Sequence, residues 1–316
     1  RRRGDPTLRV MKVVRVLDPS RADDLARRTL AEGRALRALV HPNIVQLLDV
    51  GLTAHGRPFL VTELLLGGTL KEEVDSRGPL PAGEVVDILV QALSGLDVAH
   101  ARGLVHRDLK PLNIFYEQAP PNTVRRIKLL DFGIAKAVSL EAQERAGSAL
   151  VATREGYFLG SPAFMAPEQA MGKPLDGRTD LYALGTVAFY LLTGRTVFRA
   201  LSSDQILAAH FFVQPDPPSA HAPHVPAELD AIVLKALAKE PKDRFRSAFE
   251  MQQALMSLPV ARYGETRTLR PAPEVVRVPS AADELTLLHA QRTASAEEAP
   301  KPVEPPRSPS APVATA

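Results

Sequence analysis

The feature that most constrains the fold is a change in hydrophobic pattern at Gly67 and Gly68. Three segments before this point have the period or length of strands, at residues 8–17, 44–50 and 58–62. After it, apolar residues recur at helical spacing, most clearly over residues 81–102, and Gly103 would end that helix. Short strands followed by a longer helical part predict an α+β fold with a small β-rich lobe and a larger α-helical lobe.

Length and proline content suggest where this fold ends. The chain has 316 residues, enough for about two folded units at ~150 residues each. Residues 259–316 are rich in proline and poor in aromatic side chains, so they bury too little apolar surface to offset their ordering entropy. We therefore predict a partial first lobe at 1–65, a second lobe at 66–258 and a disordered tail at 259–316.

Composition excludes several functional classes. The chain has no cysteine, which excludes disulfide scaffolds, thiolate metal sites and cysteine nucleophiles. A net charge of +3 gives no reason to expect a nucleic-acid partner. The most apolar stretch, residues 181–192, is too short to span a bilayer and predicts a helix at the centre of a large core. We expect a cytoplasmic domain with no membrane span in this chain.

Two charged residues interrupt otherwise apolar faces in the first lobe. Lys12 lies on the apolar face of the first predicted strand, and Glu32 lies in the apolar stripe of the following predicted helix. That stripe consists of Leu25, Thr29, Glu32, Leu36 and Leu39. A buried charge is costly unless it is paired, so we predict that Lys12 and Glu32 face each other. The alternative is two surface side chains whose charged ends reach water.

Short motifs indicate a family. Residues 106–113 read HRDLKPLN, residues 131–133 read DFG and residues 166–168 read APE. With Lys12 and Glu32, they resemble the signature set of protein kinases. HPNIV at 41–45, MAPEQ at 165–169 and RTDLYALG at 178–185 resemble bacterial Ser/Thr kinases that share the eukaryotic kinase fold. The resemblance covers about residues 5–258 and implies a bilobal protein-kinase-like fold.

The resemblance also implies a role for each polar residue in phosphoryl transfer. Asp108 would accept the proton of the substrate hydroxyl, and Lys110 would lie near the γ-phosphate of ATP. Asn113 and Asp131 would supply oxygen ligands to Mg²⁺ or Mn²⁺. Lys12, held by Glu32, would bind the α- and β-phosphates. Lys110 is typical of kinases that act on Ser/Thr hydroxyls.

The same resemblance assigns the residues around the adenine ring. Thr62 matches the gatekeeper position, and Glu63 and Leu65 match the hinge residues whose backbone meets adenine. Val10 lies where the family usually has alanine above the ring. Phe115 completes the expected cofactor-binding set.

Other positions match structural or regulatory residues of the family. Four match the stacked side chains that link the lobes, namely Leu36, Leu47, His106 and Phe132. Asp180 would anchor this stack, and Arg244 would pair with Glu168. Histidines at 210, 221 and 224 lie in or beside a proline-rich stretch without a cysteine partner, which predicts ordinary histidines rather than a metal site.

The segment from 131 to 168 would carry regulation. Ser161 precedes a proline at a position that normally contacts the catalytic loop, so we expect it to be structural. Thr153 is our candidate for phosphorylation, because its phosphate could pair with Arg107. Alternatively, Glu155 supplies a fixed negative charge that reduces dependence on phosphorylation.

One family motif is missing, because no glycine-rich loop precedes Lys12. Either this sequence is a fragment whose parent carries that loop, or the protein is a pseudokinase or scaffold. We favour a Ser/Thr protein kinase that uses ATP on protein substrates and that can phosphorylate itself or form a dimer. In the form given we expect it to be weak or inactive, with an exposed edge on its small sheet.

Overall fold

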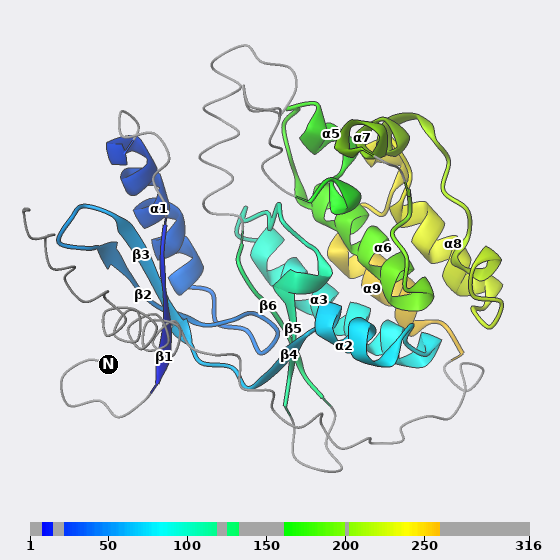
Figure 1. Ribbon diagram of the computed structural model, residues 1–316, viewed down its shortest axis with the longest axis horizontal. Helices are drawn as coiled ribbons and strands as arrows, with labels where there is room; N and C mark the ends of the chain where they lie inside the picture. The colour runs from blue at the N-terminus through cyan, green and yellow to red at the C-terminus, as the bar shows by residue number, and fades with distance from the viewer. Residues whose placement is uncertain (1–7, 15–21, 119–124, 133–160, 200–201, 260–316) are drawn as a thin grey trace, which may run out of the picture. The chain divides into compact units, whose positions relative to one another are not determined.

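A computed structural model describes residues 8–14, 22–118, 125–132, 161–199 and 202–259 (Figure 1). All of them belong to the first of the two units into which the chain divides, Arg1–Ala272. Within these described ranges, no helix combines the length and the apolar character that a bilayer crossing requires. Residues 260–316 of the predicted tail at 259–316 and the candidates Thr153 and Glu155 lie outside the described residues.

A sheet and one helix form the first part of the fold. Strands β1 (Arg9–Val13), β2 (Leu47–Leu52) and β3 (Pro58–Glu63) make an antiparallel sheet in the order β1-β3-β2. The long helix α1 (Ala22–Arg37) precedes β2 and packs on β2 and β3. In the described sheet, β1 and β2 lie at the two edges.

The second predicted strand begins later than its sequence suggested. We expected residues 44–50, but Ile44 forms a parallel bridge with Leu129, and the Val45 amide donates to the Leu129 carbonyl over 3.0 Å. These two apolar residues therefore pair with a strand of the second sheet and leave β2 to start at Leu47. The difference arises because an apolar run does not reveal which sheet its backbone joins.

The second part is mainly helical, as predicted. Its small sheet has the order β4 (Gly67–Thr69), β5 (Ile114–Glu117) and β6 (Ile127–Leu129). Its helices are α2 (Leu70–Arg77), α3 (Ala82–His100), α5 (Pro167–Ala170), α6 (Gly177–Thr193), α7 (Ser203–Phe212), α8 (Ala227–Ala236) and α9 (Ala248–Met256). Short 3₁₀ turns lie at Pro111–Asn113, Pro162–Phe164, Pro218–Ala220 and Pro241–Asp243.

Helix α6 lies at the centre of this core. Every residue from Thr179 to Thr193 is buried, which confirms the prediction from the apolar stretch at 181–192. The helix packs against α3, α8 and α9, and Gly194 ends it in the left-handed conformation. Because the core around α6 is close-packed, the helix holds the side chains near its start in fixed positions. One of these is the fully buried Asp180.

Candidate active site

The catalytic-loop candidates follow directly after α3. Gly103, with φ of 71°, turns the chain, and the loop then crosses the start of α6. There the buried carboxylate of Asp180 accepts hydrogen bonds from the backbone amides of His106 and Arg107, over 2.8 and 2.9 Å. Nε2 of His100 lies 2.8 Å from the same carboxylate. Asp180 thus anchors the loop and, through the His106 amide, one member of the stack that the resemblance expected it to hold.

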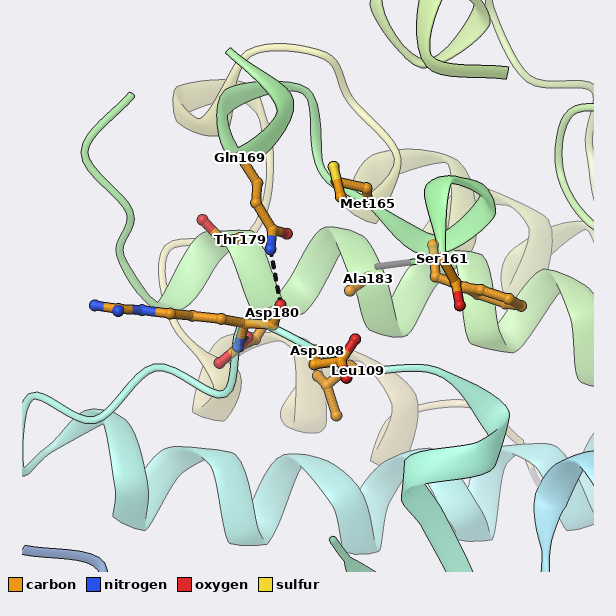
Figure 2. Close-up of a pocket in the computed structure, with 10 residues that line it drawn as sticks. Asp108, Leu109, Ser161, Met165, Gln169, Thr179, Asp180 and Ala183 are labelled. Atoms are coloured by element: carbon orange, nitrogen blue, oxygen red, sulfur yellow. Dashed lines mark hydrogen bonds between the residues drawn. The ribbon is translucent and has the colours of Figure 1, made fainter. Parts of the chain in front are cut away.

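Three predicted catalytic residues lie together on this loop. Nζ of Lys110 is 3.1 Å from Oδ2 of Asp108. The Asn113 side-chain amide donates to the same Oδ2 over 2.9 Å and to the Asp108 carbonyl over 2.8 Å. Asp108 also lines a small pocket with Ser161 and Thr179 (Figure 2). The loop therefore presents a half-buried carboxylate whose orientation is held by an amide and a lysine.

His106 joins this loop to the strand that leads to Asp131. Its Nδ1 accepts from the Asp108 amide over 3.3 Å, and its Nε2 lies 2.7 Å from the Leu130 carbonyl. Burial lowers the pKa of His106, which favours the neutral ring with a proton on Nε2. The ring also contacts Phe132, with centroids 4.6 Å apart. Both are buried, as are Leu36 and Leu47, the other expected members of the stack.

Asp131 lies opposite Lys12. Nζ of Lys12 donates to both carboxylate oxygens of Asp131, over 2.6 and 2.5 Å. Asp131 has a φ of 49°, an uncommon conformation for a residue with a side chain. Sequence reasoning proposed Glu32 as the partner of Lys12 and did not foresee this pair with Asp131. The pairing with Glu32 stays a prediction.

The residues expected around adenine come from both sheets. Val10 and Thr62 are direct partners in the β1–β3 register, and both are half-buried. Phe115 pairs with Thr69 and Lys128 in the second sheet. Glu63 ends β3, and Leu65 follows two residues later, before β4 begins at Gly67.

An ion pair that was not predicted from the sequence lies at this point, with Lys128 buried and Glu63 partly exposed. Nζ of Lys128 lies 2.6 Å from Oε1 of Glu63, which also accepts from the Gln46 amide over 2.8 Å. The sequence contained a sign of this pair: Lys128 is the one charged residue in the apolar run 127–130, and a buried charge needs a partner. The pair connects the end of β3 to β6, and Lys128 lies three residues before Asp131.

The pair of Glu168 and Arg244 is confirmed. Two guanidinium nitrogens of Arg244 lie 2.7 Å from the two carboxylate oxygens of Glu168. Thr179 also donates to Glu168 over 2.9 Å. These buried contacts fix the four-residue helix α5 against the start of α6.

The donor set fits a hard divalent cation. Asn113 uses its side-chain NH₂ group on Asp108, which leaves Oδ1 as its possible ligand atom, and Asp131 offers a carboxylate. The backbone amide of Leu130 donates to the Asn113 carbonyl over 2.8 Å, which ties the two ligand-bearing segments together. Mg²⁺ commonly takes only one or two side-chain ligands along with phosphate oxygens and water, so these two groups suit it.

Comparisons with known proteins agree with this geometry. The protein kinase domain family matches residues 2–256. The chain is 44% identical to serine/threonine-protein kinase Pkn1 of Myxococcus xanthus over 232 residues, 73% of this chain and 32% of that protein. It is 34% identical to PknB of Mycobacterium tuberculosis (strain ATCC 25618 / H37Rv) over 255 residues, 80% of this chain and 38% of that protein.

A solved structure supports the fold. The crystal structure of Rad53 1-466 in complex with AMP-PNP is similar to this chain, with a TM-score of 0.61 and 23% sequence identity. The match covers 78% of this chain and 57% of that one. The chain therefore has the fold of these proteins, and it spans about a third of the length of the two curated relatives.

Proposed function

We infer the activity of this chain from its family: it belongs to the protein kinases, and its relatives are named Ser/Thr protein kinases. We propose that it transfers the γ-phosphate of ATP to Ser or Thr hydroxyls of protein substrates, its own chain included, in the cytoplasm. The observation that carries this proposal is the cluster of Asp108, Lys110 and Asn113 on one anchored loop.

Asp108 would orient the substrate hydroxyl and accept its proton. A carboxylate can do this only if it is held within hydrogen-bond reach of the hydroxyl, and the amide of Asn113 restrains Asp108 in this way. Lys110 already lies beside the same carboxylate, so a phosphoryl group that approaches Asp108 also approaches its ammonium group. The proton leaves the hydroxyl as its oxygen bonds to the γ-phosphorus, and the bond from that phosphorus to the bridging oxygen of ADP breaks.

Lys12 and Asp131 would bind the phosphate end of ATP. Their ion pair is half-exposed, so Lys12 can exchange the carboxylate for phosphate oxygens at little cost. Asn113 and Asp131 would hold Mg²⁺, which neutralises phosphate charge when bound. Glu32 remains the residue that we propose to orient Lys12.

The adenine ring of ATP would lie between the two sheets. Val10 and Phe115 offer apolar surfaces, and Thr62 closes one side with a small side chain. The backbone of Glu63 and Leu65 would meet the edge of adenine. The Rad53 structure that resembles this fold contains the ATP analogue AMP-PNP, which supports a nucleotide site of this kind.

The test is phosphate transfer from γ-labelled ATP by the protein in its full natural length. Loss of the carboxylate in Asp108→Asn should lower the rate about 100-fold or more, because a positioned general base contributes about that much. Binding of a fluorescent ATP analogue should stay within about twofold, since Asp108 does not hold the nucleotide. Equal transfer by wild type and variant would refute a kinase and favour a binding module that uses the kinase fold.

A further inference from the structure

The catalytic loop contains a residue that cannot hold its conformation alone. Arg107 has a φ of 63° although it carries a side chain, and such left-handed conformations persist only where the surroundings enforce them. Arg107 directly precedes Asp108. A rotation of the peptide between them would therefore move the carboxylate that we propose as the proton acceptor.

Hydrogen bonds hold Arg107 from both sides. Its amide donates to Oδ1 of Asp180 over 2.9 Å. Its carbonyl accepts from Nε2 of Gln169 over 2.8 Å, the dashed line in Figure 2. The following amide, that of Asp108, donates to Nδ1 of His106. The peptide that connects Arg107 to Asp108 is thus fixed at its oxygen by Gln169 and at its nitrogen by His106.

Gln169 comes from a different part of the chain, the short helix α5. Gln169 is only 5% exposed. A buried side-chain amide needs a hydrogen-bond partner, and the Arg107 carbonyl is that partner for Nε2. The preceding residue, Glu168, is fixed by Arg244 and Thr179. Two neighbouring residues of α5 therefore have separate contacts: Glu168 is bound to the core, and Gln169 is bound to the catalytic loop.

We propose that Gln169 is a positioning residue for Asp108, an inference that rests on the proposed kinase function. Its amide holds the Arg107 carbonyl so that the loop keeps its left-handed turn only while α5 is docked. A displacement of α5 would remove this hydrogen bond. Gln169 therefore links α5 to the loop that carries the acceptor carboxylate.

The experiment compares Gln169→Met with a matched control, Gln252→Met. Methionine keeps the length of glutamine and removes the donor. Gln252 also donates to a backbone carbonyl, that of Val90 over 2.9 Å, but it joins α9 to α3. We expect Gln169→Met to lower kcat about 10- to 100-fold, because small misplacements of a catalytic group have effects of this size. KM for ATP should stay within about twofold of wild type.

In Gln252→Met we expect a loss of thermal stability no larger than in Gln169→Met, because Gln252 is only partly buried, with kcat within about twofold of wild type. Gln169→Glu is the second variant, because it has the same size and replaces the donor with an acceptor; its kcat should fall at least as far. The positioning role is overturned if wild type is active and either Gln169 variant keeps its kcat. It is also overturned if kcat falls as much in the Gln252 control as in the Gln169 variants. If wild type and Asp108→Asn transfer phosphate equally, the kinase function fails, and this inference fails with it.

Discussion

Two ion pairs of this chain share their chemistry and differ in their surroundings. Arg244 and Glu168 pair behind the catalytic loop, with 0% and 6% of their side chains exposed. Lys12 and Asp131 pair in the candidate nucleotide site, with 49% and 47% exposed. Arg244 also donates to three backbone carbonyls, those of Ala238, Arg178 and Lys239.

This difference in exposure makes the Arg244–Glu168 pair permanent and the Lys12–Asp131 pair exchangeable. The buried pair has fixed partners for its donors, and loss of either member would leave a charge without water or counterion. The exposed pair is screened by water, so either member can take another partner at small cost. A nucleotide site requires such exchange, whereas the support of a catalytic loop requires permanence.

The largest expected effect comes from breaking the buried pair. Arg244→Met should lower the free energy of unfolding by about 3–5 kcal/mol, because Glu168 would remain buried without its counterion. Urea unfolding monitored by circular dichroism measures this change. The double variant Glu168→Gln/Arg244→Met should lose less, since it leaves no unpaired charge. A loss below about 1 kcal/mol in the single variant would mean that the buried pair is no more permanent than the exposed one.

A buried histidine near Arg244 should make the stability of the fold depend on pH. Nδ1 of His210 lies 2.7 Å from the Tyr182 hydroxyl, and the Tyr182 ring also contacts Arg244. Burial and then the charge of Lys239 lower the pKa of His210 to about 4 from about 6.5. The unfolded chain therefore binds more protons between these values, and stability should fall by up to about 3 kcal/mol as pH decreases from 7 to 4.

The difference between wild type and His210→Gln isolates this contribution. The variant should show a smaller loss of unfolding free energy over the same pH range, measured in urea at pH 7, 5.5 and 4.5. His55→Gln, at an exposed position on a turn, is the control and should follow wild type. Identical pH profiles for wild type and His210→Gln would show that burial does not keep His210 neutral.

Much of the site could be predicted because its residues are close in sequence. Asp108, Lys110 and Asn113 span six positions, so one loop brings them together once it has formed. The central helix α6 was also predictable, because a segment that is apolar on nearly all sides must be buried. The Arg244–Glu168 pair came from the family resemblance, since no local pattern joins two residues so far apart.

Contacts between distant segments were the part that sequence reasoning missed. Gln169 reaches Arg107 and Lys128 reaches Glu63 through tertiary packing, which neither strand nor helix periodicity encodes. For Lys12, periodicity indicated that a carboxylate should pair with it but could not show which carboxylates lie within reach. It pointed to Glu32 on the adjacent helix, whereas the pair with Asp131 joins residues 119 positions apart.

The smallest expected change in stability comes from the exposed pair and completes the comparison. Lys12→Met should alter the free energy of unfolding by less than about 1 kcal/mol, because water and salt already screen its pair with Asp131. The same variant should bind ATP more weakly, since Lys12 is our proposed phosphate ligand, and titration with a fluorescent ATP analogue measures that loss. A stability loss as large as that of Arg244→Met would contradict the distinction, because it would make Lys12 part of the permanent framework. Weaker ATP binding with unchanged stability would instead identify Lys12 as a residue retained for exchange between Asp131 and phosphate.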